Sequence, residues 1–316
     1  MMRRARWFGA LALSLAVGAC SKDETPPPPK MGDGTVRAVA TVVSGGTAFR
    51  LPFDAALSPD GKTAYFTALV DEGAALFKSP ATGGPPTKLA DLVGLGSVEV
   101  TSDGSTVLVG DPATEPSPGA LGAIVAVPSS GGTPSVLTGT EGSLPQGIAI
   151  AGRRVVFSGV DPADGVPGVF ETSASGGLSV VLKAGLIDPS GVTVASSGEV
   201  YVLDAESDSA STRRILRIAS GSATELVKGL RVGYPAGIAL AENGLYLVVA
   251  STDPVTGTAR FERFGLSGTA AGAPVEMTIG SFDEPAGLHR AAGTDRYAYV
   301  DSGANGTGTV FVVNPQ

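Results

Sequence analysis

Short apolar runs that alternate with polar residues recur along the chain, and a glycine turn separates the two runs of each pair. The clearest case spans residues 188–206 and reads "DPSGVTVASSGEVYVLDAE", with its turn at Gly198. Alternation with a period of two predicts strands, because successive side chains of a strand point to opposite faces. The segment therefore predicts the inner half of a small antiparallel sheet that begins with a Pro-x-Gly motif and ends at an acid.

The same unit occurs six times. The turn glycines lie 43, 48, 46, 46 and 49 residues apart, and a period of about 40 to 50 residues with several strands per unit is typical of β-propellers. The 45 glycines and 23 prolines of the chain suit short strands joined by tight turns. The turn glycines are Gly61, Gly104, Gly152, Gly198, Gly244 and Gly293.

Each unit predicts four strands. In the fourth copy the innermost strand is expected at Gly191–Ala195 and the second at Val200–Leu203. "RRILRIAS" (213–220) and "ATELVKGL" (223–230) follow as the third and outer strands. The second strand is apolar on both faces, which fits a sheet packed between two neighbouring blades.

The ends of the repeat array predict how the ring closes. The last copy ends with its third strand, "GTGTVFVVNPQ", whereas residues 35–46 match the outer strands of other copies. We therefore predict an all-β fold, a six-bladed β-propeller of four-stranded antiparallel blades in which strand 35–46 completes the last blade. An open β-solenoid is the alternative, but closure removes exposed edges and explains the permutation. The blades are expected at 47–94, 95–143, 144–187, 188–233, 234–283 and 284–316.

The first 20 residues predict export. An arginine cluster precedes an apolar stretch of about 11 residues, too short to span a bilayer, and small residues follow it. The segment 17–20, Val-Gly-Ala-Cys, resembles the lipobox of bacterial lipoproteins, which implies cleavage before Cys20 and lipidation of its thiol. An ordinary signal peptide with a chance cysteine is the alternative. By the enterobacterial sorting rule, Ser21 favours the outer membrane.

Residues 21–34 predict a tether between the lipid and the propeller, because their four consecutive prolines favour extended polyproline II structure. The chain carries a net charge of -8. The first 20 residues hold three arginines and no acid, so the mature charge is 19 − 30 = −11. This excess excludes nucleic-acid binding and leaves the lipid anchor as the only expected contact with the membrane. The single cysteine excludes an intramolecular disulfide.

Six acids are expected on one face, because the loop before each innermost strand and the loop after each second strand share that face. We interpret them mainly as turn caps, since aspartate bonds readily to nearby backbone N–H groups. The alternative is an acidic ligand face, to which Gln146 and Ser190 would also contribute, suited to a basic or neutral partner, either a protein or a small molecule. The acids are Asp71, Asp111, Asp161, Asp204, Asp253 and Asp301.

The repeated pattern Pro-x-Gly, apolar alternation, Gly turn and Tyr-Val-x-Asp resembles NHL-type propellers and the wider senescence-marker-protein/gluconolactonase group over roughly residues 35–316. In gluconolactonase-like enzymes the resemblance implies a divalent metal at the ring centre, held by Asn, Asp and Glu in the middle of such Pro-x-Gly segments. None of the matching residues here is a carboxylate or asparagine, so we predict no metal and no cofactor. The matching residues are Phe53, Gly96, Gln146, Ser190, Ala236 and Ala286.

Three residues stay as candidates for chemistry. Asp54 lies one place after a matching position, and His289, the only histidine, shares its strand register with Glu99 of another blade. A histidine could act as a base, with Glu99 as a distant partner across the funnel, although a structural histidine is the favoured interpretation. The acidic run 204–208 begins like a calcium loop but lacks its glycine and closing glutamate, which leaves calcium a minor alternative. Nucleophile-elbow and phosphate-loop motifs are absent.

Two function hypotheses follow. The first is a non-enzymatic binding or scaffold propeller anchored by lipid in the cell envelope, with recognition by loops on a rigid scaffold. The alternative is a gluconolactonase-like or lyase-like hydrolase with a degenerate or rearranged site around Asp54, Glu99 and His289.

Overall fold

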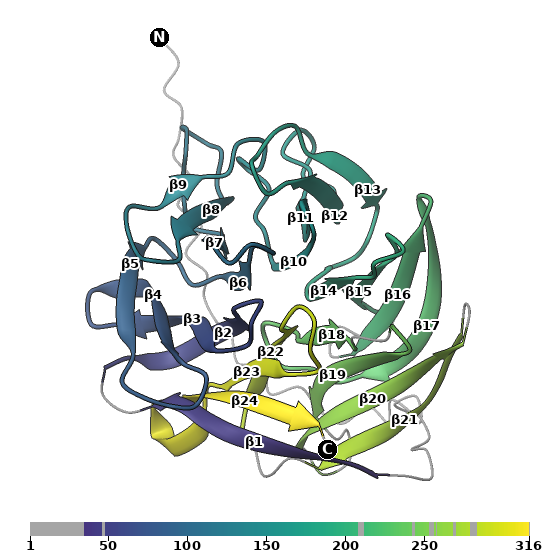
Figure 1. Ribbon diagram of the computed structural model, residues 1–316. Coiled ribbons are helices and arrows are strands. Elements are labelled where there is room, and N and C mark those ends of the chain that lie inside the picture. Colours follow the sequence, from purple (N-terminus) through teal and green to yellow (C-terminus); the bar gives the residue numbers. More distant parts are fainter. Residues whose placement is uncertain are drawn as a thin grey trace, which may run out of the picture.

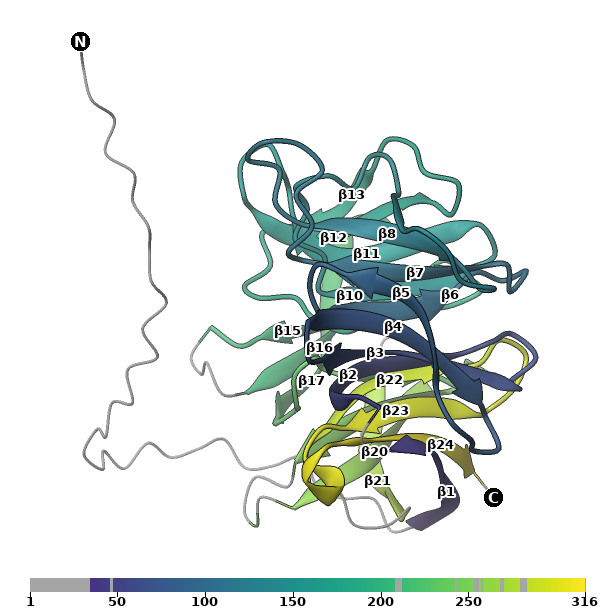
Figure 2. The ribbon, with the colours of Figure 1, turned by 90° about the vertical axis from the view of Figure 1, so that its left-hand side faces the viewer.

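The computed structural model describes residues 35–45, 48–207, 212–241, 244–252, 256, 258–267, 270–278 and 283–315. Across these ranges the chain forms 24 β-strands and one short 3-10 turn, Ala304–Gly306. Twisted sheets radiate from a common centre (Figure 1), and the view along the edge shows them stacked around the ring (Figure 2). Within the described ranges, no helix is long and apolar enough to cross a membrane.

Four blades are separate four-stranded antiparallel sheets whose strands follow one another from the centre outward. Blade one contains β2 (Arg50–Leu57), β3 (Thr63–Val70), β4 (Gly73–Pro80) and β5 (Thr87–Leu92). Blade two contains β6 (Ser97–Val100), β7 (Thr106–Asp111), β8 (Ala123–Pro128) and β9 (Ser135–Val136). Blade three contains β10 (Gly147–Ala151), β11 (Arg154–Val160), β12 (Pro167–Ser173) and β13 (Val180–Ala184). Blade four contains β14 (Val192–Val194), β15 (Val200–Ala205), β16 (Arg213–Ala219) and β17 (Ser222–Leu230).

Blades five and six are joined into one eight-stranded sheet. Blade five contains β18 (Ile238–Leu240), β19 (Tyr246–Thr252), β20 (Ala259–Ser267) and β21 (Ala270–Thr278). Blade six contains β22 (Pro285–Arg290), β23 (Tyr297–Asp301), β24 (Thr309–Pro315) and β1 (Thr35–Gly45). The prediction of an all-β, six-bladed propeller with four antiparallel strands in each blade is therefore confirmed.

The first described strand closes the ring as expected. β1 runs antiparallel to β24, from the pair Ala38–Pro315 to the pair Gly45–Thr309, and Figure 1 shows the purple strand beside the yellow one. The sequence did not predict the second partner of β1, which is β21. The first three residues of β1 pair in parallel with β21, and this short pairing joins blade six to blade five. Both neighbours of β1 thereby lose an exposed edge.

Apolar side chains fill the spaces between the blades. Six clusters of buried residues each draw on two adjacent blades, so every blade has two packed faces. In the fourth blade, Val200 and Val202 pack with blade three, whereas Tyr201 and Leu203 pack with blade five. Full burial of such a side chain contributes about 1.5 to 3 kcal/mol. The alternation in the sequence therefore becomes packing on both sides of one sheet.

Deletion of residues 35–46 should destabilise the whole propeller, because it exposes edges on β24 and β21 at once. We expect the midpoint of thermal unfolding, followed by circular dichroism, to fall by at least about 10 °C. Deletion of residues 21–34, the predicted tether, is the control and should leave the midpoint unchanged. Equal midpoints for the intact chain and the chain without residues 35–46 would refute closure by β1.

Candidate functional site

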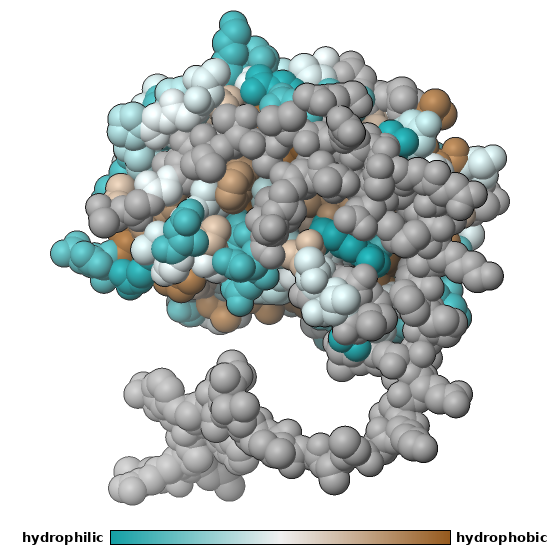
Figure 3. Space-filling model, turned by 90° about the horizontal axis from the view of Figure 1, so that it is seen from below, coloured by the Kyte–Doolittle hydropathy of each residue, from teal (hydrophilic) through white to brown (hydrophobic). Residues whose placement is uncertain are grey.

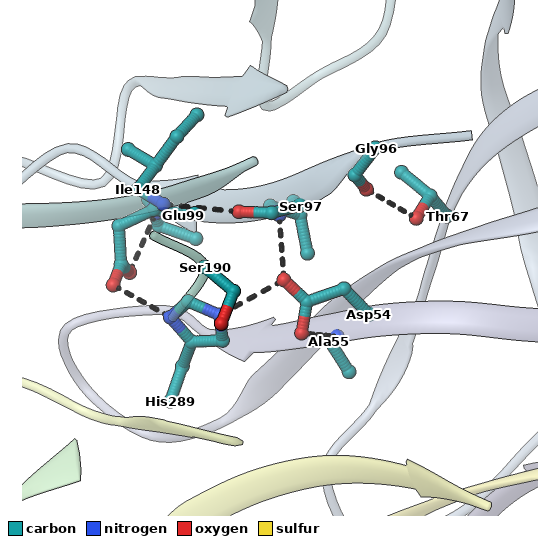
Figure 4. A network of polar contacts seen from close by, with 12 residues as sticks. Asp54, Ala55, Thr67, Gly96, Ser97, Glu99, Ile148, Ser190 and His289 are labelled. Atoms are coloured by element: carbon teal, nitrogen blue, oxygen red, sulfur yellow. Dashed lines mark hydrogen bonds and ion pairs between the residues drawn. The ribbon is translucent and has the colours of Figure 1, made fainter. Parts of the chain in front are cut away.

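The innermost strands of the six blades surround the axis of the ring, and each contacts the next, including β22 with β2. His289 of β22 projects between Asp54 of β2 and Glu99 of β6 (Figure 4). Its Nε2 lies 2.9 Å from Oδ2 of Asp54, and its Nδ1 lies 3.1 Å from Oε2 of Glu99. The three candidates for chemistry thus form one cluster from three blades. Glu99 is a direct neighbour of His289, so the expectation of a distant partner was wrong.

Both carboxylates are held by backbone groups as well as by the histidine. Asp54 Oδ1 accepts a hydrogen bond from the N–H of Ala55, and its Oδ2 accepts one from the N–H of Val98 in the next blade, each at 2.9 Å. Glu99 Oε1 accepts from the N–H of Val100 at 2.9 Å. The side chains of His289, Asp54 and Glu99 are only 10%, 1% and 14% exposed. The cluster therefore braces the centre of the ring and binds blades one, two and six together.

The protonation state of His289 follows from this geometry. Burial by itself disfavours the charged imidazolium, but the charges and hydrogen bonds of Asp54 and Glu99 outweigh burial and raise the pKa of His289 to about 10. At neutral pH both ring nitrogens therefore carry protons and donate to carboxylate oxygens. A doubly protonated imidazole has no free lone pair, so His289 cannot act as a general base in this arrangement.

Little open space remains along the axis beside this cluster. The cavity shared by Asp54 and His289 has a volume of about 10 Å³. The one shared by Glu99, His289 and Arg290 has about 50 Å³. Such volumes suit one or two ordered waters rather than an organic substrate. Arg290 lines the second cavity and is partly buried, and its guanidinium donates to the carbonyl of Leu240 at 2.7 Å.

Three side chains from different blades contact one another on the loop side of the axis. The hydroxyl of Tyr234, from the loop before β18, donates to Oε1 of Gln146 at 2.8 Å. The ring of Tyr234 meets the ring of Phe53 edge to face, with 5.5 Å between the centroids. Blades one, three and five are thereby joined above the axis. The sequence pattern missed this contact, because periodicity places Tyr234 in a loop without indicating which blade it reaches.

The residues at the centre do not fit the divalent metal that the gluconolactonase resemblance implies. Such a cation needs several free oxygen ligands converging from different blades, but here Asp54 and Glu99 face an imidazolium cation. Ser190 is buried and donates its hydroxyl to the carbonyl of Leu203 at 3.3 Å, while Gln146 bonds to Tyr234. Within the described ranges, no three His, Cys, Asp or Glu side chains are arranged to hold a metal ion. We therefore derive no metal-dependent step.

Three of the six expected rim acids are buried and bind backbone N–H groups. Asp111, Asp204 and Asp301 are at most 1% exposed. Each lies at the end of the second strand of its blade and holds the loop that leads into the innermost strand. Asp111, for example, accepts from the N–H groups of Val93 and Gly94, each at 3.1 Å. The corresponding bonds of Asp204 and Asp301 are 2.8 to 3.0 Å long, to residues 187–188 and 283–284.

The other three acids have different surroundings. Asp161 is partly exposed and caps its own turn through the N–H of Ala163 at 2.9 Å. Asp71 is fully exposed and pairs with Arg50 at 3.0 Å. Asp253 and the end of the acidic run at Asp208 lie outside the described residues, as does Cys20. The six acids therefore do not form one uniform acidic ring, because only some of them face solvent.

Replacement of His289 by glutamine should lower the free energy of unfolding by about 2 to 4 kcal/mol at pH 7, since it leaves buried carboxylates without a cation. A pKa raised from 6.5 to about 10 stabilises the native state fully below pH 6.5, and this stabilisation is lost as the pH rises through 10. The difference in the free energy of unfolding between wild type and His289→Gln, measured by urea unfolding, should therefore shrink from pH 7 to pH 10.

The matched control is Thr193→Ala, an uncharged change at the same register position in blade four. The loss of unfolding free energy that Thr193→Ala causes should not vary between pH 7 and pH 10. A gap between wild type and His289→Gln that stays constant from pH 7 to pH 10 would mean that His289 is neutral in the folded protein.

Comparison with known proteins supports the fold. No protein-family profile and no curated protein sequence matches the chain. Among solved structures, a protein assigned as TolB from Agrobacterium tumefaciens aligns with 17% identity and a TM-score of 0.56, over 90% of this chain and 99% of that one. A glucose dehydrogenase aligns with 11% identity and a TM-score of 0.63, over 88% and 100%. A gluconolactonase from Xanthomonas campestris aligns with 14% identity and a TM-score of 0.50, over 92% and 98%. At such identities the likeness establishes the propeller fold alone.

Proposed function

We propose that this protein is a non-enzymatic binding propeller, anchored by lipid in the cell envelope, whose partner docks on one face of the ring. The observation that carries the proposal is the filled axis. His289, Asp54 and Glu99 occupy the centre, and Tyr234 contacts two other blades on the loop side of the axis. The cavities beside these groups, of about 10 and 50 Å³, are too small to hold an organic substrate, whereas the surrounding loops stay open to a larger partner.

The face suited to a partner is the loop face, which consists of the loops before the innermost strands and those between second and third strands. Five of the large hydrophobic side chains that are exposed lie on this face, at the start of β2 and in loops of blades two, four and five, and exposed apolar groups on one face are typical of interaction sites. They are Leu51, Val93, Leu121, Ile187 and Tyr234, which are 43% to 68% exposed. On the described part of the flank shown in Figure 3, hydrophobic residues are interspersed with hydrophilic ones.

The negative charge of the loop face indicates the chemistry of a partner that would bind there. Exposed carboxylates of Asp164, Asp188, Asp283 and Glu284 lie in loops of the same face, and Asp188 is the direct neighbour of Ile187. The mature chain also carries the net charge of −11 derived above. Complementary charge speeds encounter and selects partners. We therefore expect a protein partner that presents apolar side chains flanked by lysine or arginine.

The alternative, a hydrolase or lyase with a rearranged centre, is favoured by one observation: Asp54, Glu99 and His289 meet at the axis. Burial and the protonation of His289 oppose it, because a general base needs a free lone pair and access to the substrate. We expect the purified mature protein to hydrolyse gluconolactone no faster than buffer, with or without magnesium, calcium or zinc. A faster rate that Glu99→Gln abolishes, with folding intact, would favour the enzyme.

The binding proposal is tested by site-specific photocrosslinking in the native envelope. A photoreactive residue at Ile187, on the loop face, should give discrete adducts with another protein. The same residue at Lys62, exposed in the turn between β2 and β3 on the opposite face, is the matched control and should give none. Equal patterns from both positions would contradict a binding site on the loop face.

The anchor is tested in the same cells with the Cys20→Ser variant, which cannot be lipidated. The protein should move from the membrane fraction to the soluble fraction, and adducts with a membrane-bound partner should decline at equal expression. Membrane association that survives the substitution would exclude Cys20 as the anchor, while the crosslinks from Ile187 would still report on binding.

A further inference from the structure

A second site lies on the opposite side of the ring, between blades two and three. The turn face consists of the hairpin turns between first and second strands and between third and fourth strands. There the turn 101–106, which joins β6 to β7, faces Gly152 and Arg153 of the β10–β11 turn and Ala174 and Ser175 of the β12–β13 turn. These turns line an open cavity of about 570 Å³. Small-molecule sites commonly have ~300 to 1,000 Å³.

Three of the hydroxyl groups that line this cavity donate their protons within the protein. Thr101 donates to Oδ1 of Asp103 at 2.7 Å, and Ser105 donates to the same oxygen at 2.9 Å. Ser102 donates to the carbonyl of Gly152 at 3.0 Å, which links the turns of the two blades. Each hydroxyl oxygen retains lone pairs. The hydroxyls therefore present acceptors to a ligand that brings its own O–H donors.

Asp103 adds a carboxylate to these acceptors. Its hydrogen bonds with the Thr101 hydroxyl and with the backbone and hydroxyl of Ser105 lower its pKa to about 2, so it is ionised at neutral pH. Those bonds all use Oδ1, which leaves Oδ2 facing solvent. A carboxylate oxygen of this kind accepts hydrogen bonds from neighbouring hydroxyls of a sugar ring.

Arg153 supplies the only guanidinium among the residues that line this cavity. Among the described residues its guanidinium forms no ion pair or hydrogen bond, whereas the next residue, Arg154, pairs with Glu171 at 2.6 Å. Arg153 also borders a neighbouring cavity of about 330 Å³ on blade three. In a protein with a large excess of acids, an exposed and unpaired arginine beside a cavity provides local attraction for a carboxylate or phosphate.

We infer that the cavity between blades two and three binds a small acidic saccharide, that is, a sugar that carries a carboxylate or phosphate group. Arg153 would pair with the anionic group. Asp103 and the hydroxyl oxygens of Ser102 and Ser105 would accept hydrogen bonds from the sugar hydroxyls. The site lies on the turn face, whereas the protein partner is proposed to dock on the loop face. The two proposals can therefore be tested independently.

The test uses saturation-transfer NMR on the full-length protein in detergent micelles, with D-glucuronate, glucose 6-phosphate and D-glucose as probes. We expect millimolar binding of the two acidic sugars and at least about tenfold weaker binding of glucose. Arg153→Gln should weaken glucuronate binding by about tenfold or more. Lys62→Gln removes a positive charge from another turn on the same face and should leave binding unchanged. Thermal unfolding verifies that both variants fold.

Three results would overturn the inference. They are no binding of either acidic sugar, equal binding by wild type and Arg153→Gln, and equal binding of glucose and glucuronate. Sulfate is included as a competitor. If sulfate displaces glucuronate as well as glucose 6-phosphate does, the cavity takes an adventitious ion only and the sugar hydroxyls contribute nothing.

Discussion

A ring of six blades has to fill its own axis, and here a buried ionic cluster fills it. The innermost strands converge until a histidine from blade six reaches carboxylates of blades one and two. Each of these charges alone would be costly to bury, but paired and hydrogen-bonded they become tolerable. The cluster therefore joins blade six, which β1 completes from the outside, to blades one and two.

The architecture could be predicted from the sequence because it depends on local chemistry. Glycine turns such as Gly198 have positive φ, and the alternation in strands such as Val200–Leu203 encodes two packed faces. The missing outer strand of the last repeat was equally visible. The parallel pairing of β1 with β21 was not, because it covers three residues and depends on how far two blades splay apart.

The candidate site was predictable only in part. Strand register placed Glu99 and His289 at the same depth, and the Pro-x-Gly alignment singled out Asp54. Register does not give the width of the channel, so it could not show that all three side chains touch. It also could not distinguish the buried Asp204 from the exposed Asp71, because both lie at the end of a second strand. They differ in the neighbouring loop, whose backbone N–H groups donate to Asp204.

For the binding function proposed above, the filled axis leaves the rims as the surfaces on which a partner can dock. A metal ion held by the carboxylates would need free oxygen ligands and an open funnel through which to enter. The imidazolium of His289 is part of the chain, so it needs no open funnel. Once His289 pairs with both carboxylates, the centre becomes part of the packing. Its ionic bonds lie between side chains that are at most 14% exposed. Under that proposal, variation in the loops and turns would change the partner without disturbing the cluster that holds the ring closed.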